Sequence, residues 1–102
     1  MSETIARQKV VVTNPQGLHL RPAYKFVELA GKFDATIEII KDAERVDGKS
    51  ILDIATLAIE NGTEVEIEAT GQDAEDAISA LVELVEKDFR DSAASEATEE
   101  NN

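Results

Sequence analysis

The spacing of apolar residues along the chain predicts three helices. Between Leu20 and about Gly31 the apolar positions recur at i, i+3, i+4 and i+7, as they do on the buried face of a helix. A shorter helix is expected over residues 51–59, capped by Ser50, and a last helix after Asp73, whose side chain is expected to cap it. The short helix is expected to bury Ile51, Ile54, Ala55 and Ala58, and the last helix Ala74, Ala77, Ile78, Leu81, Val82, Val85 and Phe89.

Runs of alternating or β-branched residues between these helices predict four strands. They cover residues 9–13, 36–41, 45–47 and 64–69, and the last alternates strictly between glutamate and apolar residues, which indicates one solvated face. The resulting order, βαββαβα, favours an α+β fold. We expect an open-faced sandwich in which a four-stranded antiparallel sheet carries three helices on one face.

Length and charge divide the chain into two regions. Its 102 residues are expected to form one domain, residues 1–90, followed by an acidic tail, 91–102, which has too few apolar residues to fold and is expected to be disordered. Residues 1–59 hold eight acidic and eight basic side chains, so the net charge of −12 comes entirely from residues 60–102. This excess of negative charge argues against nucleic acid or an anionic membrane as a partner.

The residue counts exclude several chemistries. The chain has no cysteine and one histidine, which excludes disulfides, thiolate nucleophiles and metal sites built from cysteine or histidine clusters. Neither a metal nor a cofactor is expected. There is no signal-peptide pattern, and no apolar run approaches the roughly 20 residues of a membrane span. A soluble cytoplasmic protein is therefore expected, and a monomer is expected as well.

The only histidine lies in the heptapeptide Gly17-Leu18-His19-Leu20-Arg21-Pro22-Ala23, where the first predicted helix begins. The first amides of a helix lack intrahelical partners and, together with the helix dipole, favour a bound anion. The guanidinium of Arg21 offers a fork of donors that matches phosphate geometry. The sequence therefore predicts that His19 carries a phosphoryl group covalently, with Leu20 and Arg21 as phosphate-binding residues.

This heptapeptide resembles the active-site signature of HPr, the histidine-containing phosphocarrier protein of the phosphoenolpyruvate-dependent phosphotransferase system. A second segment, Gly48-Lys49-Ser50-Ile51-Leu52, is similar to the segment around the regulatory serine of that family. The 31-residue interval from His19 to Ser50 also fits the family pattern without a gap. The resemblance covers about residues 6–90 and implies the βαββαβα fold of the family.

The resemblance implies a stoichiometric carrier rather than a stand-alone enzyme. His19 would take a phosphoryl group on Nδ1 from enzyme I and pass it to an enzyme IIA protein for sugar uptake, with Arg21 helping to hold the phosphate. Ser50 would correspond to the site of a regulatory serine kinase. Leu20, Ile51 and Leu52 would form the partner surface, because Leu52 falls off the buried stripe of its helix.

Three residues depart from the family pattern. Leu20 stands where the family usually has alanine, which changes the partner surface and not the chemistry. Asp53 places a carboxylate one turn from Ser50, where a small residue is common, and Ala55 stands where a larger apolar residue is frequent, and these two keep a second hypothesis open. The alternative is an HPr-like regulatory protein, nitrogen-type or serine-regulated, that is not directly coupled to sugar transport. For Ser50, a helix cap alone and a cap that is also a regulatory site both fit the sequence.

Overall fold

The computed structural model describes residues 3–13 and 20–88. The elements follow one another as β1 (Ile5–Val11), α1 (Leu20–Ala30), β2 (Thr36–Lys41), β3 (Glu44–Asp47), α2 (Ile51–Thr56), β4 (Glu64–Thr70) and α3 (Ala74–Glu83), and a π-helical turn, η1 (Leu84–Asp88), extends α3. The predicted order is confirmed. The turn before His19, His19 itself, Phe89 and the predicted tail 91–102 lie outside the described residues.

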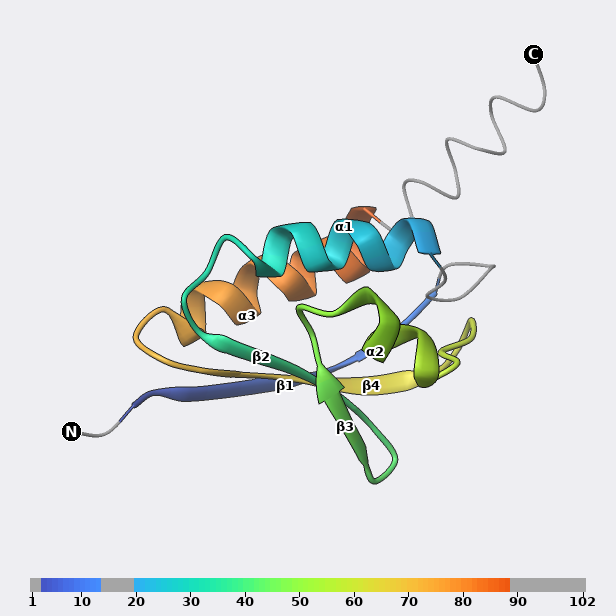
Figure 1. Ribbon diagram of the computed structural model, residues 1–102, viewed down its shortest axis with the longest axis horizontal. Helices are drawn as coiled ribbons and strands as arrows, with labels where there is room; N and C mark the ends of the chain where they lie inside the picture. The colour runs from blue at the N-terminus through green and yellow to red at the C-terminus, as the bar shows by residue number, and fades with distance from the viewer. Residues whose placement is uncertain (1–2, 14–19, 89–102) are drawn as a thin grey trace, which may run out of the picture.

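The four strands form one antiparallel sheet in the order β1-β4-β2-β3, and the three helices lie on one face of it (Figure 1). This is the predicted open-faced sandwich. Val10 pairs with Val65, and Ile39 pairs with Ile67, so apolar side chains of adjacent strands meet on the helical side. The largest fully buried side chains come from both layers: Phe26, Ile37, Ile39, Ile54, Ile67, Leu81 and Val12.

Strand β1 begins at Ile5, four residues before the predicted start at Lys9. The prediction relied on the β-branched run and omitted the more polar residues before it. These residues are held in the sheet because β4 is seven residues long and pairs with β1 along its whole length, from Ile5 opposite Thr70 to Val11 opposite Glu64. An edge strand with one solvated face accommodates polar side chains readily.

Helix α2 ends at Thr56 rather than at Ile59, and the prediction that Ala55 and Ala58 are buried is wrong. The buried residues after Ile54 are Leu57 and Ile59, which would point roughly 200° apart on a continuous helix. The backbone instead enters the left-handed region at Ala58, with φ of 50°. This break allows both side chains to reach the core, at the cost of a conformation that alanine disfavours.

Asp73 lies at the N-cap position of α3, but its side chain does not cap that helix as predicted. Its two carboxylate oxygens accept hydrogen bonds from the backbone N–H groups of Asp34 and Ala35, each at 2.9 Å. The loop after β4 lies directly against the loop after α1, since a Cβ added to Gly71 would be 3.0 Å from the Cα of Ala35. This close approach brings the carboxylate to the amides of the neighbouring loop.

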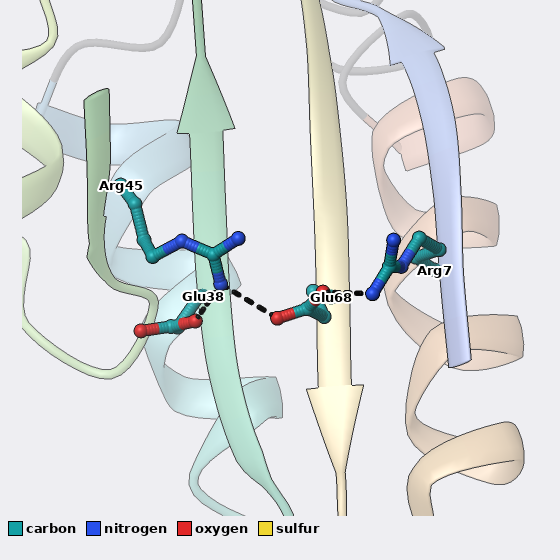
Figure 2. Close-up of polar contacts among 4 residues, drawn as sticks. All are labelled: Arg7, Glu38, Arg45 and Glu68. Carbon is teal, nitrogen blue, oxygen red and sulfur yellow. Dashed lines mark hydrogen bonds and ion pairs between the residues drawn. The ribbon is translucent and has the colours of Figure 1, made fainter. Parts of the chain in front are cut away.

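A charge network crosses the face of the sheet that the helices leave uncovered (Figure 2). Glu68 of β4 forms ion pairs with Arg7 of β1 at 2.8 Å and with Arg45 of β3 at 2.7 Å, and Arg45 also binds Glu38 of β2. The prediction that this face is solvated holds for Glu64, whereas the Glu68 side chain is only 10% exposed. The hydrogen bond from Arg45 lowers the pKa of Glu68 below its ordinary value.

We expect this network to make stability depend on pH. A carboxyl group whose pKa is lower in the folded state stabilises the fold above its unfolded pKa, about 4.3, and this contribution is lost as the pH falls through the folded value. Glu68→Gln should therefore lower the free energy of unfolding at pH 7 by about 1 kcal/mol, a modest value because both arginines are half-exposed. Urea denaturation at pH 7 and at about pH 3 measures the difference.

The gap between the wild type and Glu68→Gln should close at the acidic pH. Glu64→Gln, at an exposed position in the same strand, is the matched control and should change stability little at either pH. A gap of equal size at both pH values would show that the charge of Glu68 does not contribute.

Candidate functional site

The start of α1 is the part of the predicted histidine site that lies within the described residues. The helix begins at Leu20, directly after His19, and its first turn contains Arg21 but no acidic residue. The amides at this end are therefore not already neutralised by a carboxylate of the same turn. Arg21 is exposed. The placement of His19, outside the described residues, stays a prediction.

The rotation of α1 is set by its apolar stripe. Ala23, Phe26 and Ala30 are buried, and this turns Arg21 and Tyr24 outward. Tyr24 is 57% exposed, one turn after Arg21, and was not among the residues predicted for the site. The signal was present in the sequence, because Tyr24 falls off the helical stripe and is a large aromatic residue beside the motif.

Each residue of the segment Gly48-Lys49-Ser50 has a structural role. The N–H of Gly48 donates to the carbonyl of Ile37 at 2.7 Å, and a Cβ at Gly48 would be only 2.7 Å from Cγ2 of Ile37, so a larger residue would clash. The ammonium of Lys49 donates to the carbonyl of Phe33, also at 2.7 Å. These contacts hold the segment against β2 and the loop that follows α1.

Ser50 is the N-cap of α2, as predicted. Its backbone is extended, with φ of −123° and ψ of 115°, and its Oγ accepts a hydrogen bond from the N–H of Asp53 at 3.2 Å. The carbonyl of Ser50 accepts the first helical bond, from the N–H of Ile54 at 3.1 Å. The cap is thus a sufficient structural reason for a serine here.

Helix α2 exposes the apolar residue that the sequence singled out. Leu52 is 80% exposed, Ile51 is half-buried, and Ile54 on the opposite side is completely buried. Helices α1 and α2 contact each other at the end of the molecule where α1 begins (Figure 1). Arg21 and Tyr24 on α1 and Leu52 on α2 therefore belong to neighbouring helices. The prediction that Leu20 contributes to the same surface is not tested by the described side chains.

A polar groove lies next to the segment that contains Ser50, although Ser50 itself is not among its lining residues. This groove, of about 410 Å³, is lined by Lys49 and Asp53 together with residues of β2, β3 and the loop before β2. Its acidic lining residues, Asp34, Glu38, Asp47 and Asp53, outnumber the basic ones, Arg45 and Lys49. A negative group added at Ser50 would lie one residue after Lys49 and three before Asp53, a basic and an acidic residue of this lining.

Two further properties describe the part of the chain that is placed. Within residues 3–13 and 20–88, no helix is long and apolar enough to cross a membrane. Over the same residues, no group of three or more histidine, cysteine, aspartate or glutamate side chains is arranged to hold a metal ion.

The sequence matches the family described as "PTS HPr component phosphorylation site" over residues 6–87, and the chain belongs to the HPr family. It is 37% identical to the phosphocarrier protein HPr of Neisseria meningitidis over 79 residues, which are 78% of this chain and 89% of that protein. It is 37% identical to the HPr-like protein Crh of Bacillus subtilis over 84 residues, 82% of this chain and 99% of Crh.

A third relative is much longer than this chain. The phosphoryl donor subunit DhaM of the phosphoenolpyruvate-dependent dihydroxyacetone kinase of Providencia stuartii is 39% identical over 93 residues. The match covers 91% of this chain and 20% of DhaM. Among solved structures, an HPr from Thermoanaerobacter tengcongensis superimposes with a TM-score of 0.80 at 42% identity, covering 82% of this chain and 94% of that chain. The fold is therefore that of HPr proteins.

We expect the cap at Ser50 to contribute measurably to stability. Ser50→Ala leaves the N–H of Asp53 without its side-chain acceptor and should lower the free energy of unfolding by about 0.5–2 kcal/mol. Ser79→Ala is the matched control, since Ser79 is an exposed residue within α3, where alanine is a better helix former. Equal stability of both variants in urea denaturation would contradict the capping role.

Proposed function

We propose that this chain is a phosphocarrier that accepts a phosphoryl group from phosphoenolpyruvate through enzyme I on Nδ1 of His19. It then passes the group to enzyme IIA proteins for sugar uptake. The observation that carries the proposal is that α1 begins immediately after the only histidine, with Arg21 and no acidic residue in its first turn. We also propose that the protein is a monomer in the cytoplasm and has no cofactor of its own.

The chemistry is an exchange of one phosphorus–nitrogen bond for another. Nδ1 of His19 attacks the phosphorus of the phosphohistidine of enzyme I, whose P–N bond breaks as the new one forms, and the acceptor later attacks the same phosphorus. The amide of Leu20 and the guanidinium of Arg21 bind the phosphate oxygens. A carrier must release the group again, so moderate stabilisation at an exposed helix end suits it better than a buried clamp.

A regulatory role is the second candidate function. Ser50 is the N-cap of α2 and precedes the exposed Leu52 by two residues, so its phosphorylation by a serine kinase would add charge beside a partner surface. The relatives also differ from one another. DhaM is the phosphoryl donor subunit of a dihydroxyacetone kinase. Crh is an HPr-like protein that crystallises as a domain-swapped dimer. The experiments must therefore establish whether the phosphoryl group is passed on for sugar uptake or for another process.

The direct test of the carrier is phosphoenolpyruvate-dependent labelling in the presence of enzyme I. We expect one acid-labile phosphoryl group on the wild type, none on His19→Ala, and slower labelling of Arg21→Ala, because a guanidinium–phosphate contact contributes about 1–3 kcal/mol. Circular dichroism of each variant checks that it is folded. Labelling of His19→Ala at the wild-type level would disprove the site, and adding purified enzyme IIA proteins then shows whether the group moves on.

The test of regulation uses a charge in place of a phosphate. Ser50→Asp keeps a side chain that can cap α2 but adds a negative charge beside Leu52, so we expect slower transfer from enzyme I to His19. Ser50→Asn is the control, because asparagine also caps a helix and carries no charge. Equal transfer rates for the two variants would reduce Ser50 to a helix cap.

A further inference from the structure

Lys41, the last residue of β2, binds the end of a helix that is distant in the sequence. Its Nζ donates to the carbonyl of Leu57 at 2.8 Å and approaches the carbonyl of Ala58 at 3.4 Å. Both carbonyls follow α2, where the last carbonyls of a helix lack intrahelical partners and the helix dipole is negative. Lys41, at the end of β2, therefore caps the C-terminal end of α2.

Helix α2 is short, and polar contacts hold both of its ends. It has six residues, far fewer than an isolated helix requires, and Ile54 is its one buried side chain among the described residues. Ser50 caps its first turn. Its last turn runs into Ala58, a non-glycine residue with positive φ, so the chain at this end is strained and is secured by the ammonium of Lys41.

We propose that Lys41 is a positioning residue for phosphoryl transfer: by holding the C-terminal carbonyls of α2, it fixes the orientation in which α2 presents Leu52 to a docking protein. This inference rests on the function proposed above. Leu52 is 80% exposed, and Ile51 is half-buried. A docking surface that is already ordered binds with less loss of conformational entropy than one that must be ordered on binding. Lys41 acts through α2 and not by touching the partner.

The test is the steady-state phosphorylation of the full chain by enzyme I, with this protein as the varied substrate. Lys41→Met keeps most of the side-chain length but removes the donor, and we expect KM to rise about threefold to tenfold while kcat changes less than about twofold. Lys41→Arg should recover much of the wild-type KM, since a guanidinium can donate to the same carbonyls. Lys9→Met removes the same charge from β1, which pairs only with β4, and should leave KM unchanged.

A second pair of variants separates positioning from stability. In the Lys41→Met background, Ala58→Gly relieves the positive φ and should raise the melting temperature without restoring KM. The effects of Lys41→Met and Leu52→Ala on KM should be non-additive, because Lys41 acts through the presentation of Leu52. Recovery of KM together with the melting temperature, or additive effects, would overturn the inference and leave Lys41 as a stabilising contact only.

Hydrogen exchange gives a readout that does not depend on enzyme I. Lys41→Met should speed exchange at the amides of Leu57 and Ala58, which close the C-terminal end of α2, and leave the amides of α3 unchanged. If the wild type is phosphorylated and Lys41→Met has the wild-type KM, the inference fails and the proposed function stands. If enzyme I does not phosphorylate the wild type, the proposed function fails, the positioning role falls with it, and faster exchange would then report a helix cap alone.

Discussion

All three helices bury their apolar sides against the same face of one sheet, and the exposed residues of the candidate site are a consequence of that packing. Burial of Phe26 turns Arg21 and Tyr24 of α1 outward, and burial of Ile54 turns Leu52 of α2 outward. Burying a large apolar side chain contributes about 1.5–3 kcal/mol, compared with about 0.5–1.5 kcal/mol for a typical hydrogen bond. The core therefore decides the rotation of each helix, and the polar contacts adjust its ends.

Those polar contacts join loops and helix ends that are far apart in the sequence. Asp73 binds the amides of Asp34 and Ala35, Lys49 binds the carbonyl of Phe33, and Lys41 binds the carbonyl of Leu57. In each case a charged side chain satisfies a backbone group that has no partner in regular secondary structure. These hydrogen bonds lie at short connections between elements. Together they hold α2 and the loop after α1 in place relative to the sheet.

The uncovered face of the sheet is organised by charge. Arg7 and Arg45 come from the two edge strands and meet at Glu68 in the interior strand β4, so one carboxylate links both edges to the centre (Figure 2). The long arginine side chains cover Glu68 and explain how a glutamate on the face without helices is buried. Charged side chains on edge strands also discourage pairing with other chains. In a protein of net charge −12, this network is locally balanced.

The sequence by itself determined the features of this structure that depend on local interactions. The start of α1, the four strands, the buried stripe of α3 and the cap at Ser50 follow from periodicity and from contacts within a few residues. The tertiary structure decided the rest, because the partners lie 16 or more residues apart, as for Lys41, or because core packing overrode a local pattern, as at Ala58. Asp73 shows the difference most clearly: it is a good helix cap by sequence, but the amides of a loop 38 and 39 residues earlier are better placed to bind it.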